Sequence, residues 1–123
     1  MRLDVDKSDY FYNFDLEMLS KGVYFMLKGS LVVYIGKSQC ISSRISEHMY
    51  GDNKKLPGKQ YDKIKYLKLN KISKKNLKIV EEAFIKLFKP KYNRESFLKE
   101  KHITQGEINI IKECCDIDLL EYI

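Results

Sequence analysis

The residue of this sequence with the clearest chemical potential is Glu81, a glutamate within a predicted helix. At about 100° per residue, with Leu77 set to 0°, Glu81 falls at roughly 40° among apolar side chains, whereas Glu82 falls at roughly 140°. Lys78 and Lys86 lie one turn before and after Glu82, which is the usual arrangement of a solvated ion pair. A carboxylate on an apolar face is costly unless it is paired or binds a cation. Glu81 is therefore either half of a salt bridge at the edge of the core or a metal ligand.

Arg44 and His48 lie one helical turn apart on the same face of another predicted helix. Arginine is rare in this chain, because 20 of its 23 basic residues are lysine. The planar fork of Arg44 suits two hydrogen bonds to phosphate oxygens. The alternatives are that the stem of Arg44 covers the helix edge and that His48 is a packed histidine. Neither residue alone distinguishes a site from ordinary packing.

Two tyrosines, Tyr24 and Tyr34, lie ten residues apart in a predicted β-hairpin. An odd-length turn would place them directly opposite one another on one face of the sheet. A two-residue turn at Gly29-Ser30 would place them on opposite faces. The spacing alone leaves both turns open, and the simpler interpretation of the pair is two aromatic core residues.

These residues depend on elements that the pattern of the chain predicts. The hairpin is indicated by two apolar runs around a Gly-Ser break, and the strand after it by strict alternation with one wet face. Ser38, Ser73 and Thr104 are predicted to cap helices, Thr104 within a capping box with Glu107. The predicted elements are a hairpin at 21–37, a helix at 39–50, a basic loop at 51–59, a strand at 62–69, and helices at 73–89 and 104–115, with one more turn within 116–123. This order predicts an α+β fold with a small antiparallel sheet.

Charge divides the 123 residues into three segments. Residues 21–94 have 18 basic and 5 acidic side chains, a net charge of +13, whereas residues 1–20 have −3 and residues 95–123 have −4. Such a positive segment favours a polyanionic partner, and nucleic acid is the usual one. The alternative is a lysine-rich solvated surface that reflects an AT-rich coding sequence.

Other classes of protein are disfavoured by composition. Hydrophobic residues make up 44% of the chain, which is typical of a globular domain. Apolar runs are too short for a membrane span, which needs roughly 18 residues. Three cysteines without a common zinc spacing indicate free thiols. We therefore expect a cytoplasmic protein in a reducing compartment, without a membrane.

The combined motifs resemble those of the GIY-YIG nuclease family. The resemblance spans residues 22–93, with its elements in the family order, and Val23 replaces the isoleucine of the first triplet. His48 stands where some members have tyrosine. The matching residues are Gly22-Val23-Tyr24, Tyr34-Ile35-Gly36-Lys37, Arg44, His48, Glu81, Pro90 and Asn93. The resemblance implies a three-stranded antiparallel sheet flanked by helices, and a metal-dependent endonuclease that hydrolyses DNA phosphodiester bonds.

The resemblance also implies a role for each matching residue. Glu81 would bind a divalent metal, Mg²⁺ or Mn²⁺, and Arg44 would hold the scissile phosphate. Tyr24 would help activate the attacking water, with Tyr34 close by and His48 as a rival general base. The resemblance and the even spacing together predict the odd-length turn, with both tyrosines in one cleft with Arg44 and Glu81. The residues expected to contact nucleic acid are Lys37, the loop lysines Lys54, Lys55 and Lys59, and Asn93, which would otherwise orient local backbone.

We interpret the chain as one compact domain with three parts. Residues 1–20 form an acidic N-terminal segment, residues 21–94 the catalytic core, and residues 95–123 an acidic helical extension. The extension is expected to pack on the core or to dock a partner, either a second copy of the chain or another protein. The rival to the nuclease is a catalytically silent module of the same fold that binds nucleic acid.

Overall fold

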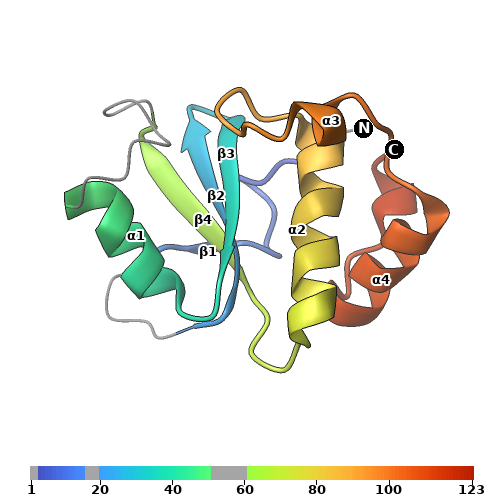
Figure 1. Ribbon diagram of the computed structural model, residues 1–123, viewed down its shortest axis with the longest axis horizontal. Coiled ribbons are helices and arrows are strands. Elements are labelled where there is room, and N and C mark those ends of the chain that lie inside the picture. Colours follow the sequence, from blue (N-terminus) through green and yellow to red (C-terminus); the bar gives the residue numbers. More distant parts are fainter. Residues whose placement is uncertain (1–2, 16–19, 51–60) are drawn as a thin grey trace.

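The computed structural model describes residues 3–15, 20–50 and 61–123, and only the backbone within residues 47–50. Its elements form a sheet with helices on both faces (Figure 1). In chain order they are β1 (Tyr12–Asn13), β2 (Gly22–Lys28), β3 (Leu31–Ser38), α1 (Ile41–Tyr50), β4 (Lys63–Lys68), α2 (Lys74–Phe88), α3 (Ser96–Lys99), α4 (Gln105–Cys115) and the 3₁₀ turn η1 (Leu119–Glu121). Within these described residues, the helices are too short or too polar to cross a membrane.

The sheet is antiparallel and has the strand order β1-β4-β2-β3. The predicted α+β class is confirmed, but the sheet has a fourth strand in addition to the three expected. The extra strand is β1, in which Tyr12 pairs with Tyr66 and Asn13 with Lys65. Two residues are too few for an alternating pattern, so the sequence carries no periodic signal for this strand.

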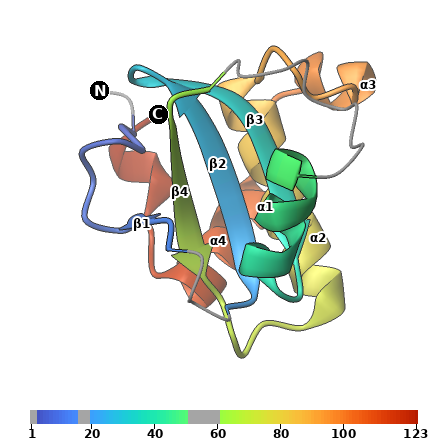
Figure 2. The same ribbon diagram turned by 90° about the vertical axis from the view of Figure 1, so that its left-hand side faces the viewer.

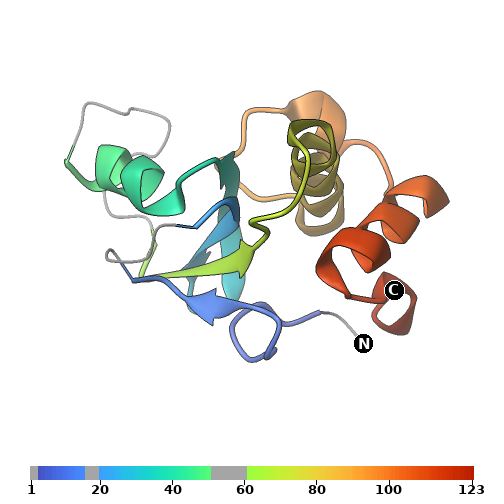
Figure 3. The ribbon, with the colours of Figure 1, turned by 90° about the horizontal axis from the view of Figure 1, so that it is seen from below.

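Both faces of the sheet are covered. Helix α1 lies on one side, and α2 and α4 lie on the other (Figures 1 and 3). In β4, Tyr66 packs toward α1 and Leu67 toward α2, and they are 1% and 3% exposed. The prediction that this strand has one wet face is therefore wrong. Lys65, which the alternating pattern predicts to be exposed to solvent, is buried as well.

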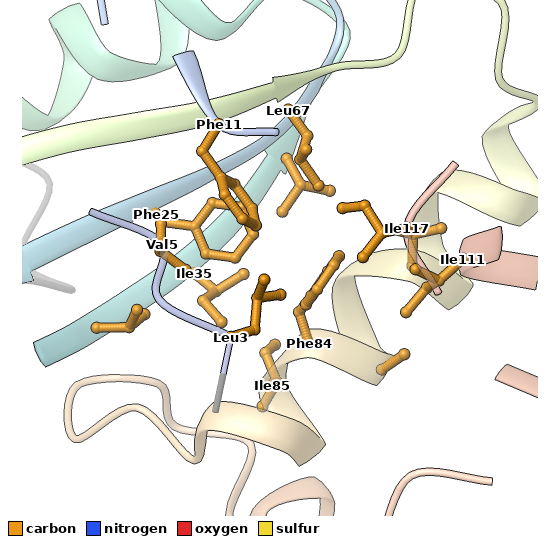
Figure 4. Close-up of a cluster of buried hydrophobic side chains, with 14 of the residues drawn as sticks. Leu3, Val5, Phe11, Phe25, Ile35, Leu67, Phe84, Ile85, Ile111 and Ile117 are labelled. Carbon is orange, nitrogen blue, oxygen red and sulfur yellow. The ribbon is translucent and has the colours of Figure 1, made fainter. Parts of the chain in front are cut away.

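The main core lies between the sheet and α2 (Figure 4). The ring of Phe25 meets the ring of Phe84 edge-on, with centroids 5.3 Å apart, and Phe11 meets Phe25 in the same way at 5.1 Å. Side chains from both acidic segments enter this cluster, Val5 from the N-terminal one and Ile111 from the C-terminal one. Burying each such side chain contributes about 1.5–3 kcal/mol. The segments that flank the basic region thus help to hold the core together.

The helix caps at the starts of α2 and α4 are as predicted. Ser73 accepts a hydrogen bond from the backbone of Asn76 at 3.1 Å, and Thr104 forms the full capping box with Glu107. Ser38 is different: α1 begins only at Ile41, and the Ser38 hydroxyl bonds the backbone of the residue two positions on. Serine caps a helix only when the following residue is helical, and here a bend intervenes.

The C-terminal extension packs on the core through α4. Lys86 of α2 forms a largely buried ion pair with Glu107 at 2.7 Å. The sequence predicts Glu82 as the partner of Lys86, but a carboxylate from a distant element takes that place. Residues 95–123 therefore pack on the core, as one of the two alternatives predicted. Binding of a second copy of the chain or of another protein at this segment stays a prediction.

Candidate active site

The face of the sheet that meets α1 is built from tyrosines rather than phenylalanines. In Figure 2, β3 passes between α1 and α2, so both helices can place side chains beside it. A smaller buried cluster fills the space under α1. Its members are Tyr24, Met26, Val33, Tyr34, Ile41, Ile45 and Tyr66.

Tyr24 and Tyr34 lie on this same face, as expected, but not directly opposite one another. In the register of β2 and β3, Tyr24 is paired with Gly36 and Tyr34 with Met26. The two tyrosine rings are therefore diagonal neighbours, with centroids 6.2 Å apart and planes tilted by 35°. Both are buried, Tyr24 at 1% exposure and Tyr34 at 7%.

The prediction of an odd-length turn is wrong. Lys28 pairs with Leu31, so the turn has only two residues, Gly29-Ser30, and Gly29 has the positive φ of 63° that such a turn needs. The shared face comes instead from a bulge in β3, where Val33 is the extra residue. A bulge inserts one unpaired residue and so reverses which side chains of the following strand point to each face. It therefore puts Tyr24 and Tyr34 on the same face, as an odd-length turn would.

Gly36 leaves the space that the Tyr24 ring occupies. A Cβ atom on Gly36 would lie 2.3 Å from both the hydroxyl oxygen and Cζ of Tyr24. No real Cβ atom approaches another heavy atom so closely, so any larger residue would displace the ring. Gly36 therefore has a steric role, leaving room for the Tyr24 ring, which the sequence motif did not indicate.

Burial makes both tyrosine hydroxyls harder to deprotonate than an ordinary tyrosine. Burial, reinforced by Tyr34, raises the pKa of Tyr24 well above its ordinary value, although a hydrogen bond with the Arg44 guanidinium acts in the opposite direction. Burial also raises the pKa of Tyr34, and Arg44 partly opposes the rise. A hydrogen bond links the two hydroxyls. The pair can thus pass or orient a proton more readily than it can remove one.

Glu81 comes from α2 and meets β3 at Lys37. Its side chain is half-buried and accepts a hydrogen bond from the backbone N–H of Lys37. The pKa of Glu81 is raised to about 7, chiefly by burial and then by the charges of Glu95 and Glu82, although the Lys37 ammonium and the Lys37 backbone hydrogen bond oppose the rise. The carboxylate thus lies at the edge of the apolar face, where the helical wheel puts it. A cation beside it would favour its charged form.

Asn93 fixes the segment after α2 to the edge strand β3. Its amide oxygen accepts a hydrogen bond from the backbone N–H of Ile35 at 2.9 Å, and its amide nitrogen donates to the carbonyl of Ile35 at 2.8 Å. The side chain is 3% exposed. Of the two roles expected for Asn93, these bonds fit the orientation of backbone; a contact with nucleic acid stays a prediction.

The structure brings some of the predicted site residues together and leaves others outside its description. Tyr24, Tyr34, Arg44 and Glu81 are close enough to affect one another's charge, and Lys37 is exposed beside them. The side chain of His48 and the whole of the basic loop lie outside the described residues. The roles assigned to His48, Lys54, Lys55 and Lys59 therefore stay predictions.

One acidic residue at this site is absent from the sequence motifs. Glu95 acts electrostatically on both Glu81 and Tyr34. It follows an irregular segment, so no helical or strand periodicity marks it. Its position two residues after Asn93 is the signal that could have indicated it.

The donor set suits a cation that keeps most of its waters. Among the described residues, no group of three or more His, Cys, Asp or Glu side chains forms a metal cage. Mg²⁺ does not need such a cage, because one or two carboxylates and a substrate phosphate commonly suffice. Glu81 provides a half-buried carboxylate, and one oxygen of Glu95 is buried without a hydrogen-bond partner in the described part of the chain. These residues fit a divalent cation.

Comparisons with known proteins bear on the family and the fold. The GIY-YIG catalytic domain family matches residues 20–93. The fold resembles crystal structures of the GIY-YIG N-terminal endonuclease domain of UvrC from Thermotoga maritima, one with magnesium as its catalytic divalent cation and others with one residue substituted. For the magnesium-bound domain, identity is 24% and the TM-score 0.55, with 63% of this chain and 90% of that chain covered. For a variant with an asparagine replaced by alanine, identity is 23% and the TM-score 0.55, with 63% of this chain and 89% of that chain covered.

No protein with a curated description matches the chain. The family match, however, covers more than half of the chain and includes both tyrosine triplets, Arg44, Glu81 and Asn93. The tyrosines, the arginine and the glutamate of that match converge at one edge of the sheet. The chain therefore belongs to the GIY-YIG catalytic domain family.

Proposed function

We propose that the chain is a metal-dependent endonuclease that hydrolyses phosphodiester bonds of DNA. The observation that carries this proposal is the convergence of Tyr24, Tyr34, Arg44 and Glu81 from four different elements at the β3 edge. A packed core has no need of an arginine and a carboxylate beside buried hydroxyls, since each is costly to bury. Phosphodiester hydrolysis can use all three kinds of group: a cation for the phosphate, a carboxylate for a metal and a hydroxyl for proton transfer.

Arg44 is suited to hold the scissile phosphate. Its guanidinium is half-buried in α1, and its hydrogen bond with Tyr24 fixes its position. A fixed arginine stabilises the charge that develops on the phosphoryl oxygens without reorganising during the reaction. Lys37, exposed at the end of β3, can add a second positive charge next to the same phosphate.

Glu81 would hold the divalent cation, Mg²⁺ or Mn²⁺. When bound, such a cation polarises a phosphoryl oxygen and lowers the pKa of a coordinated water. The hydrogen bond from the Lys37 backbone orients the Glu81 carboxylate. Because α2 is packed into the main core on its other side, the carboxylate is held on a rigid element.

Tyr24 would relay or orient the proton of the attacking water. Its raised pKa argues against a tyrosinate in the resting protein, so His48 remains the rival general base. The hydrogen bond of Tyr34 with Tyr24 would position the relay. The basic loop lysines and the net charge of +13 over residues 21–94 would draw the DNA backbone to this edge.

The test is incubation of the purified chain with supercoiled, linear, branched and single-stranded DNA, with Mg²⁺ and with a chelator. Cleavage of at least one of these substrates that requires Mg²⁺ is the expected result. Binding to DNA without cleavage under any condition would instead identify a catalytically silent module of the same fold. The panel also ranks DNA structures as substrates.

A further inference from the structure

Among the described residues, one buried carboxylate oxygen, on Glu95, lacks a hydrogen-bond partner. This atom, Oε2, is fully buried. Glu95 stands at the N-terminal cap position of α3, but its side chain makes no capping hydrogen bond. A buried carboxylate oxygen without a partner is costly, so its place calls for an explanation.

The backbone around Glu95 is tightly held. Its carbonyl accepts hydrogen bonds from Leu98 and Lys99 at 3.0 and 3.2 Å. Upstream, the N–H of Tyr92 donates to Val33 at 2.9 Å, and the Asn93 side chain holds the next segment to β3. The Glu95 side chain therefore extends from a fixed position beside the strand that carries Tyr34.

Lys99, four residues after Glu95 and at the other end of α3, does not pair with its carboxylate. The ammonium of Lys99 donates instead to the carbonyls of Pro90 and Asn93, at 3.2 and 2.7 Å. Meanwhile the charge of Glu95 acts on Glu81 and on Tyr34, which places its carboxylate at the site. Two carboxylates that repel one another in a partly buried site are stabilised when a cation lies near both.

We propose that Glu95 is a positioning residue for the divalent cation, its carboxylate providing negative charge and hydrogen-bond acceptor capacity beside Glu81. The inference rests on the proposed function, because Glu81 supplies the direct ligand. Mg²⁺ keeps several of its waters when it binds to protein, and these waters need acceptors. Carboxylates that accept such bonds typically change metal affinity by about 10- to 100-fold.

The experiment measures binding of Mn²⁺ to the full chain by the loss of the free-ion electron paramagnetic resonance signal, in physiological salt. Glu95→Gln should weaken Mn²⁺ binding about tenfold, because the amide keeps the shape and removes the charge. Glu100→Gln is the matched control, since it removes the same charge from an exposed residue at the other end of α3 and should stay within about twofold of wild type.

Two further variants separate the possible failures. Glu95→Asp keeps the charge, and its affinity should lie between those of wild type and Glu95→Gln; a melting curve without metal checks that each variant is folded. Equal affinities of the Glu95→Gln and Glu100→Gln variants would overturn the role of Glu95. If Glu81→Gln leaves Mn²⁺ binding unchanged, the proposed metal site itself is wrong, and the role of Glu95 fails with it.

Discussion

The two faces of the sheet differ in what their side chains can do. The face toward α2 is largely apolar, and the rings of Phe11 and Phe84 both meet the ring of Phe25 edge-on. The face toward α1 has tyrosines in comparable positions, with hydroxyls that bond one another and Arg44. One strand, β3, serves both faces, because Ile35 points to the first and Tyr34 to the second.

This difference indicates that stability and chemistry are carried by separate layers. Burying a tyrosine hydroxyl or a carboxylate costs free energy, whereas burying a phenylalanine contributes it. Glu81 connects the layers, because α2 packs on the apolar face and extends this one carboxylate toward the edge of β3. Substitutions on the α2 side should therefore change melting, and substitutions on the α1 side should change cleavage.

The largest effect on stability is expected for Phe84→Ala. Phe84 is fully buried and contacts the rings of Phe11, Phe25 and Phe88. The cavity left behind should lower the free energy of unfolding by about 3–5 kcal/mol. Urea denaturation checks this value, and a loss below about 1 kcal/mol would show that the α2 side does not carry the core.

Tyr24→Phe should reduce the cleavage rate strongly and the stability only slightly, the opposite of Phe84→Ala. The ring and its packing remain, so loss of the hydroxyl hydrogen bonds should cost about 1 kcal/mol of stability. The cleavage rate should fall by about 10²- to 10⁴-fold if the hydroxyl helps to move a proton. Rates and melting temperatures of Tyr24→Phe, Tyr34→Phe and wild type give the comparison. Full activity of Tyr24→Phe would remove this hydroxyl from the chemistry and assign the general base to His48.

Gly36→Ala tests the positioning of the Tyr24 hydroxyl without removing it. The new methyl group would lie 2.3 Å from that hydroxyl and must displace it. A displacement of about 1 Å in a catalytic group can cost about 10²-fold in rate. Gly106→Ala is the control, since its nearest atom lies at 3.9 Å in an exposed helical turn, and it should cleave normally. Equal activity of the two variants would refute the steric role of Gly36.

The smallest effect expected is a difference in thiol reactivity between the two sides. Hydrogen bonds from Ser42 and Ser43 lower the pKa of Cys40, before α1, to about 7, and burial raises the pKa of Cys115 in α4 to about 12. Since the thiolate is the nucleophile, alkylation of Cys40 by iodoacetamide should rise with pH to half its maximum near pH 7, while Cys115 stays unmodified in the folded chain. Mass spectrometry of peptides after alkylation at several pH values measures both. Similar rates for the two cysteines would contradict the assigned environments.

Local signals in the sequence were sufficient for the longer helices α2 and α4 and for the position of Glu81, but they did not indicate the short helix α3. Ser73 and Thr104 begin helices because their side chains bond backbone groups three residues away, which a local pattern reveals. Helical periodicity places Glu81 at the edge of the apolar face, and the structure has it half-buried there. Such inferences succeed because the interacting groups are neighbours in the chain.

Features that depend on distant segments could not be read in this way. The bulge at Val33 and an odd-length turn have the same consequence for the facing tyrosines, so the sequence cannot separate them. The partner of Lys86 is Glu107, which belongs to a later helix. Glu95 reaches the site only because Asn93 holds its segment to β3. Each of these features is a matter of tertiary register rather than of local propensity.

The central claim is tested most directly by comparing Glu81→Ala with Glu82→Ala. The two glutamates are adjacent, but only Glu81 accepts the backbone hydrogen bond at the β3 edge. Glu81→Ala should abolish Mg²⁺-dependent cleavage while DNA affinity stays within a few-fold of wild type, because the metal ligand serves the transition state more than the bound ground state. Glu82→Ala should cleave normally. Equal loss of cleavage in both variants, or full activity of Glu81→Ala, would contradict the assignment of Glu81 as the metal ligand.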